Sequence, residues 1–242
     1  MKTKFLLATL VIAIVVSSCV IGVGSNVKYT TLPAEGKNMP VTSFNAIKAN
    51  GVFDIILQQG TSESVVVKGQ YPSDLKVTNE GNTLVIMDTV ENHTTSLGHR
   101  KTEIYVTFKH IDAIETESVG KIESADTITT SRFTYESDGV GASDLLIHAD
   151  SVTASENGVG ALTIAGKAHF ATIEDNGVGA LKAQNFRVNV LHATVSGVGA
   201  ANVYADSEIY LNVNGIGGLT YYGPAKVMEN TSGGVGKVQH GE

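Results

Sequence analysis

Carboxylates gather just before a repeated glycine motif, and they are the side chains of this sequence best suited to chemistry. They are Glu136, Asp138, Glu156, Glu174 and Asp175. Carboxylates on neighbouring strands lie about 5 Å apart, and such clusters bind Ca²⁺ or act as general acids and bases. In the next two repeats, however, the same positions hold Thr194-Val195 and Asn212-Val213. We therefore interpret the strip as a solvated face.

The seven histidines, the single cysteine and the serines form no other catalytic or metal-binding pattern. His148, His169 and His192 fall at three different positions of the repeat, and no His-x-x-x-His pair or second cysteine suggests a zinc site. No Gly-x-Ser-x-Gly motif is present. We expect no metal, no cofactor and no enzymatic activity.

Three tyrosines provide a candidate ligand surface. Tyr204 and Tyr222 occupy the same position in adjacent repeats, and Tyr210 lies at an outward strand position. Stacked outward tyrosines can form a platform for a sugar or a peptide, whereas the simpler interpretation is packing of each ring against the neighbouring repeat. The candidate ligand face therefore comprises Tyr204, Tyr210, Tyr222, Glu156, Glu174 and Asp175.

A Gly-Val-Gly motif recurs along the second half of the chain. Its glycines, with one degenerate first copy and one Gly-Ile-Gly copy, are Gly120, Gly139, Gly141, Gly158, Gly160, Gly177, Gly179, Gly197, Gly199, Gly215, Gly217, Gly234 and Gly236. The second glycines of successive copies are 21, 19, 19, 20, 18 and 19 residues apart. A period near 20 that persists this long indicates a solenoid.

Apolar and polar residues alternate on both sides of each motif, which is the period of a β-strand. Six residues before the first glycine stand Phe133, Val152, Ala171, Leu191, Ile209 and Met228, and the next position is polar or outward-facing in each repeat. No stretch shows a helical period of 3.6 residues. The sequence therefore predicts an all-β fold, a parallel β-helix with coils of 19–20 residues and Gly-Val-Gly corners.

The glycines are expected to form the corners because glycine adopts left-handed backbone angles without a Cβ clash. Coils about 4.8 Å apart also require backbones to approach closely. Asn157, Asn176 and Asn214, which precede three of the motifs, suit a turn because asparagine tolerates the same left-handed region. A phosphate-binding loop is disfavoured because neither a helix nor a Lys-Ser/Thr pair follows.

The N-terminus reads as a bacterial lipoprotein leader. Lys2 and Lys4 precede an apolar run that is too short to span a bilayer. Val16-Ser17-Ser18-Cys19 resembles a lipobox, in which Cys19 is lipidated after cleavage. The formal net charge of −7 argues against a nucleic-acid partner. We expect a cell-envelope protein, lipid-anchored to the outer membrane and either periplasmic or surface-exposed.

Three segments are predicted: a signal peptide over residues 1–18, a lipidated N-terminus and flexible tether over 19–40, and one β-helix domain over 41–242. Regular coils cover residues 109–238. Residues 41–108 also carry short strand patterns but no regular repeat. They form either the wider first part of the solenoid or a β cap on its open end, because an uncovered end exposes unpaired strand edges.

An opening Phe44-Asn-Ala-Ile47, then Gly51-Val-Phe-Asp54-Ile and Gln59-Gly60, followed by repeated Gly-Val-Gly-Ala, resembles the "putative auto-transporter adhesin, head GIN domain" family. The resemblance covers about Val41 to Gly236. It implies a right-handed parallel β-helix in a secreted or lipid-anchored protein of Bacteroidetes, and it supplies no catalytic residues. We expect an adhesin-like module with a glycan or protein ligand. A polysaccharide-active enzyme similar to pectin lyases stays open as the alternative.

Overall fold

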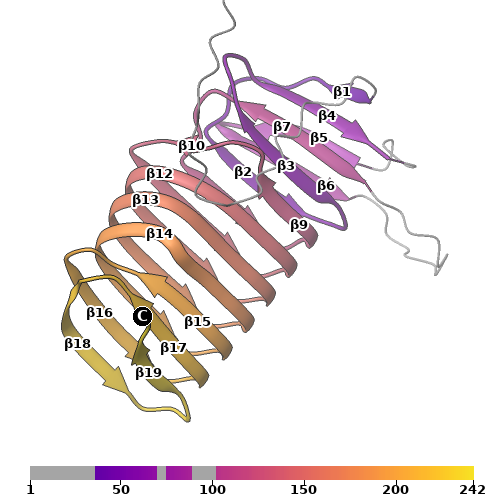
Figure 1. Ribbon diagram of the computed structural model, residues 1–242. Coiled ribbons are helices and arrows are strands. Elements are labelled where there is room, and N and C mark those ends of the chain that lie inside the picture. The colour runs from indigo at the N-terminus through magenta and orange to yellow at the C-terminus, as the bar shows by residue number, and fades with distance from the viewer. Residues whose placement is uncertain (1–35, 70–74, 89–101) are drawn as a thin grey trace, which may run out of the picture.

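The computed structural model describes residues 36–69, 75–88 and 102–242, and all of its regular elements there are strands. They join into one sheet wound as a solenoid of about seven turns, about 19 residues apart (Figure 1). The predicted parallel β-helix is therefore confirmed. Cys19 and the predicted leader lie outside the described residues. Within these residues, no helix has the length and apolar character needed to cross a membrane.

The N-terminal strands are β1 (Lys37–Met39), β2 (Ala46–Asn50), β3 (Asp54–Gln59), β4 (Ser64–Lys68), β5 (Leu75–Glu80), β6 (Thr83–Asp88) and β7 (Glu103–Phe108). The coils follow as β8 (Ala113–Thr116), β9 (Val119–Ser124), β10 (Ile128–Thr129), β11 (Arg132–Ser137), β12 (Val140–Glu156), β13 (Val159–Asp175), β14 (Val178–Val195), β15 (Val198–Tyr204), β16 (Glu208–Val213), β17 (Ile216–Tyr222), β18 (Lys226–Ser232) and β19 (Lys237–His240).

The repeats stack in the register that the glycines predicted. Gly160 of β13 pairs with Gly141 of β12 and with Gly179 of β14, and the degenerate Gly120 pairs with Gly141. Alternate side chains then point inward and form one continuous core along the axis. Phe133, Val152 and Leu191 of the predicted inward column are all at most 1% exposed.

Close backbone approach fixes the identity of the corner glycines. A Cβ at Gly160 would lie 1.6 Å from the carbonyl oxygen of Gly141, and one at Gly158 would lie 2.1 Å from that of Gly139. The second glycine of the motif also has a positive φ, 155° at Gly160, whereas Gly158 does not. From Gly141 to Gly217, positive φ angles therefore explain only the second glycine of each pair, and lack of space explains both.

The asparagines before the motif do not adopt left-handed angles, because no described residue other than glycine has a positive φ. Two of them, Asn157 and Asn176, instead form a side-chain ladder along the axis, whereas Asn214 Nδ2 donates to Asn212 Oδ1 of its own coil. Asn176 Nδ2 donates to Asn157 Oδ1 at 3.0 Å, and Asn157 Nδ2 donates to Asp138 Oδ1 at 2.9 Å. The amide suits this position because one side chain both donates and accepts.

The N-terminal part combines solenoid strands with antiparallel ones. β2 and β3 run parallel to β8 and β9, which continues the coil columns, and β6 and β7 extend the same columns outward. β5 then pairs antiparallel with β6, and β4 with β7. β1 pairs antiparallel with β4, so residues 37–39, which were predicted to belong to the tether, are part of the sheet.

The C-terminal coil departs from the predicted register. The pairing of β16 with β18 shifts between Ile209 and Tyr210, so Val227 pairs with Ile209 and Glu229 with Tyr210. Met228 is the extra residue of this bulge and is 44% exposed, so its predicted inward position was wrong. All seven residues of β18 are exposed, because this strand pairs on one side only (Figure 1).

The close backbone approach at the corner predicts that substitutions of two glycines will differ sharply in their effect on the free energy of unfolding. Gly179→Ala should lower the free energy of unfolding by about 2–4 kcal/mol, because its Cβ would lie 1.6 Å from the Gly160 carbonyl oxygen. Gly218→Ala is the control. Gly218 pairs with Ala200, and a Cβ there would come no closer than 3.5 Å to the Lys237 carbonyl oxygen. The free energy of unfolding should therefore change by less than about 1 kcal/mol. Urea unfolding measures both, and equal midpoints would contradict the register.

Candidate functional site

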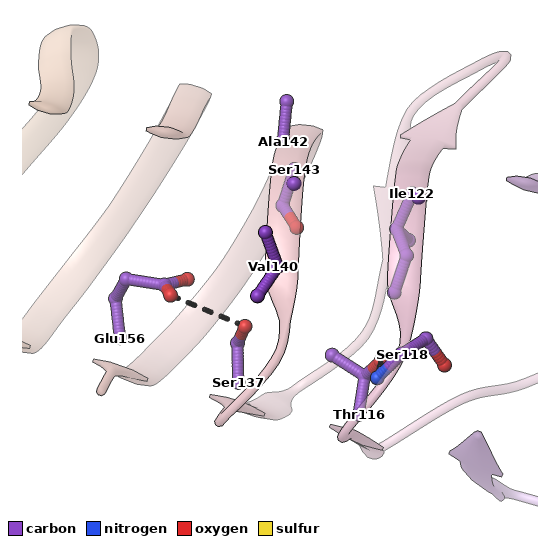
Figure 2. Close-up of a pocket in the computed structure, with 10 residues that line it drawn as sticks. Thr116, Ser118, Ile122, Ser137, Val140, Ala142, Ser143 and Glu156 are labelled. Carbon is purple, nitrogen blue, oxygen red and sulfur yellow. Dashed lines mark hydrogen bonds between the residues drawn. The ribbon is translucent and has the colours of Figure 1, made fainter. Parts of the chain in front are cut away.

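Polar side chains enter the solenoid at one inward column, two residues before the corner. In successive coils this column holds Thr116, Ser137, Glu156 and Asp175, and then Val195 and Val213. Figure 2 shows Ser137 and Glu156 turned toward one another beside the strand that carries Val140 and Ser143. This column lies an even number of residues from the apolar positions four and six residues before the corner. Its side chains therefore point inward, as theirs do.

Two carboxylates of the predicted acidic strip are therefore buried. Glu156 is 8% exposed and Asp175 is 6% exposed. Burial raises the pKa of both, since an ionised carboxylate loses solvation there. Glu136, Asp138 and Glu174 lie on the opposite side of the strand and are exposed, as predicted. The expectation of one solvated strip was wrong, because consecutive residues such as Glu174 and Asp175 face opposite ways.

These buried carboxylates satisfy the backbone of the corner. Glu156 Oε1 accepts from the Gly158 N–H at 3.1 Å and from Ser137 Oγ at 3.3 Å. Thr116 Oγ1 accepts from the Ser118 N–H in the same way. In the coils where the column holds valine, the corner N–H instead bonds a backbone carbonyl of the preceding coil, as from Gly215 to Val195. Glu156 therefore has a structural role that the valine-containing coils fill by other means.

A small cavity accompanies this polar column. It measures about 10 Å³ and is lined by Thr116, Ser118, Gly120, Ile122, Ser137, Val140, Gly141, Ala142, Ser143 and Glu156 (Figure 2). That volume suits about one water molecule and no larger ligand. Among the residues that the structure describes, no group of three or more His, Cys, Asp or Glu is placed to hold a metal ion.

A larger hollow of about 300 Å³ lies on the outside, where β3, β7 and β9 meet. Lys121 Nζ pairs there with Glu123, and with Asp144 at 2.9 Å. Tyr105 donates from its hydroxyl to Glu103 at 2.9 Å, and burial raises the pKa of Tyr105 to about 12. Sequence reasoning missed this hollow because its residues come from three separated strands and share no motif.

The predicted tyrosines divide between two strand sets. Tyr204 and Tyr222 pair in register on β15 and β17. Arg187 lies 4.7 Å from the Tyr204 ring centroid and donates to its hydroxyl at 2.8 Å. Tyr210 instead lies on β16, where its ring stacks on His192 with centroids 4.2 Å apart. The structure therefore does not gather the three tyrosines into one platform.

The middle residue of each Gly-Val-Gly motif points outward. Val140, Val159, Val178, Val198 and Ile216 form a column in which each residue is about half exposed. These residues pair in register with one another from coil to coil. Such cross-strand pairs of β-branched residues stabilise the stack.

The sequence profile of the family described as "Putative auto-transporter adhesin, head GIN domain" matches residues 43–225. The chain belongs to this family. The match spans every strand from β2 to β17 and ends before the irregular β18. No curated protein matches the chain.

Solved structures resemble this head GIN domain over nearly their whole length. A "putative adhesin" from Bacteroides fragilis is 26% identical with a TM-score of 0.80, over 85% of this chain and 96% of that one. A "putative adhesin" and a "putative lipid binding protein", both from Parabacteroides distasonis, are 22% and 16% identical with TM-scores of 0.59 and 0.62. Each of these two alignments covers 86% of this chain and 96% of the other. The latter two show the fold alone.

Burial of Glu156 gives this head GIN domain a predictable pH dependence. Its pKa is raised above 4.5, so the folded state binds more protons than the unfolded state between 4.5 and the raised value. The stability that proton binding by Glu156 contributes is therefore fully present below pH 4.5. It is lost as the pH rises through the pKa of the folded state. Glu156→Gln keeps an oxygen acceptor for the Gly158 N–H and removes the charge. The variant should unfold at a higher temperature than the wild type at pH 7.5.

The same comparison at pH 4 should show a smaller difference, because the wild-type carboxyl is then largely protonated. Glu174→Gln serves as the matched control, since this glutamate is exposed on the next residue column, and it should change the midpoint little at either pH. A Glu156→Gln midpoint below that of the wild type at pH 7.5 would contradict the assigned cost of burying this charge.

Proposed function

We propose that this protein is a non-enzymatic, adhesin-like binding module of the cell envelope, anchored to the outer membrane through a lipid on Cys19. Membership of the head GIN domain family, over residues 43–225, carries the proposal. The Bacteroides fragilis structure, which aligns over 85% of this chain, is also described as a "putative adhesin". The lipobox-like Val16-Ser17-Ser18-Cys19 supports the anchor.

The shape of the molecule suits this role. The N-terminal strands lie at one end of the solenoid and β18 and β19 at the other (Figure 1). About seven turns at roughly 4.8 Å place these ends about 30 Å apart. A lipid at Cys19 would hold the N-terminal end toward the membrane and present the C-terminal coils away from it. We infer that the ligand-binding surface lies on those distal coils.

The carboxylates support a binding role over the pectin-lyase-like alternative. Glu156 is buried and engaged with the corner N–H of Gly158, and Asp175 is buried in the same column. Glu136 and Glu174 point to the opposite side of the strand. An acid and a base acting on one glycosidic bond must face a common substrate, and these groups do not.

The lipid anchor predicts a change in fractionation. Cys19→Ala removes the sulfur to which the lipid is attached, so the protein should leave the membrane fraction or keep its leader. Ser18→Ala is the control because it preserves a small residue beside the intact cysteine, and it should fractionate as the wild type. Cell fractionation with metabolic lipid labelling measures both. Unchanged processing and membrane retention of Cys19→Ala would contradict the anchor.

The binding role predicts retention without turnover. The purified protein should bind at least one member of an immobilised panel of glycans and matrix proteins. It should release no fragments from pectic or other uronate polysaccharides, with or without Ca²⁺, by reducing-end and 235 nm absorbance assays (roughly micromolar sensitivity suffices for enzymes of ordinary rate). Cleavage that disappears in folded Glu156→Gln or Asp175→Asn would establish the enzyme alternative.

A further inference from the structure

A hollow on the outer face of the C-terminal coils is the surface best suited to a ligand. It measures about 190 Å³ and is lined by His192, Ala193, Thr194, Tyr210, Leu211, Asn212 and Glu229. We propose that this hollow binds one residue of a neutral saccharide chain. The inference rests on the proposed function and deepens it, because it assigns the ligand class and the contact residues.

The strand register explains how the hollow forms. His192, Tyr210 and Glu229 pair in succession across β14, β16 and β18, and they make one wall. Thr194 pairs with Asn212 two residues further along the strands, and they make the other wall. Between these outward columns lie the inward residues Ala193 and Leu211, whose backbone forms the floor. The hollow is thus a short groove that runs along the solenoid axis.

The aromatic wall is a local departure from the repeat. Thr134, Thr153 and Thr172 occupy the same column in the three preceding coils, and Thr172 pairs directly with His192. Small threonines suit a solvated strand face. In the following two coils the larger rings of His192 and Tyr210 make this wall taller and aromatic. Neither ring belongs to the core, so the need to fill the solenoid interior does not explain them.

The chemistry of the two walls fits a sugar. The rings of His192 and Tyr210 are nearly parallel, at 5°, and brace one another into a rigid wall. The facing wall offers the Thr194 hydroxyl and the Asn212 amide. Asn212 Oδ1 accepts from Asn214 at 2.7 Å, which leaves its NH₂ group as a donor. A saccharide residue presents C–H surfaces beside hydroxyl groups, and this combination matches the rings of one wall and the polar groups of the other.

A peptide fits this groove less well. Extended peptides bind sheets chiefly by pairing with unpaired backbone groups at an edge. The floor strands β14 and β16 already pair with one another, and β16 also pairs with β18. A peptide would therefore find only side-chain contacts there.

Charge selects a neutral sugar rather than an acidic one. Glu229 contributes a carboxylate to the hollow, and no lysine or arginine lines it. Glu208 lies beside the wall and accepts from the Tyr210 hydroxyl at 3.3 Å. A uronate or sialate would meet like charge, with no lysine or arginine in the lining to offset it. A hollow below the usual size of small-molecule pockets should bind weakly as a single site, so retention should depend on many copies acting together.

The test uses the mature full-length protein on immobilised neutral oligosaccharides, uronate polymers and matrix peptides at fixed density. The wild type should be retained by at least one neutral oligosaccharide and not by uronates. Tyr210→Thr, which restores the residue type of the preceding coils, should reduce retention at least about tenfold, as for loss of one anchoring aromatic. Tyr210→Phe preserves the ring wall and should retain most binding. Thr172→Ala in the same column is the matched control and should bind as the wild type.

Each outcome separates this site from the general function. Loss of sugar binding in Tyr210→Thr, with an unchanged unfolding midpoint, supports the assignment. Sugar binding that is equal in the wild type and Tyr210→Thr overturns it and leaves the adhesin-like role standing. Binding to peptides or uronates alone likewise overturns the ligand class only. Failure to bind any member of the panel overturns both this inference and the proposed function.

Discussion

Contact of backbone on backbone at the glycine corner is the constraint on which the rest of this molecule depends. The Val159 N–H donates to the Gly139 carbonyl at 3.0 Å, and the Val178 N–H donates to that of Gly158 at 2.9 Å. These bonds bring each corner so close to the preceding one that no side chain fits at either glycine. Every coil therefore takes its position from the coil before it, as expected of a solenoid whose stability comes from nearest-neighbour contacts.

The corner also determines where polar groups are needed and where the surface is free to vary. Its N–H groups require acceptors, and Thr116, Glu156 and neighbouring carbonyls supply them from inside. Outside, the Asn157–Asn176 ladder and the valine column link equivalent residues of successive coils. The outward columns farther from the corner supply no acceptor to its N–H groups. The departure from threonine to His192 and Tyr210 occurs in such a column, which is where a binding surface can evolve without disturbing the stack.

Much of the fold followed from the sequence because its two periods are visible there. The 19–20-residue spacing predicted the coils, and alternation predicted inward Phe133 and Val152. Strict alternation would also have placed Glu156 inward, since it lies an even number of residues from Val152, but residue type suggested a solvated face. The orientation of Met228 could not be predicted, because the bulge adds only one residue to the strand and the spacing to the next glycine motif stays intact. The Tyr105–Lys121 hollow joins strands far apart in the sequence, so local patterns carry no signal for it.

Amide hydrogen exchange, resolved along the chain, tests the central role of the corner most directly. Residues held by bonds between successive corners, such as Val159 and Val178, should exchange most slowly in the central coils. Exchange should quicken toward β18, which pairs on one side only and has all its residues exposed. Slow exchange in β18 together with fast exchange at the Val159 and Val178 amides would contradict the claim that the glycine corners hold the coils together.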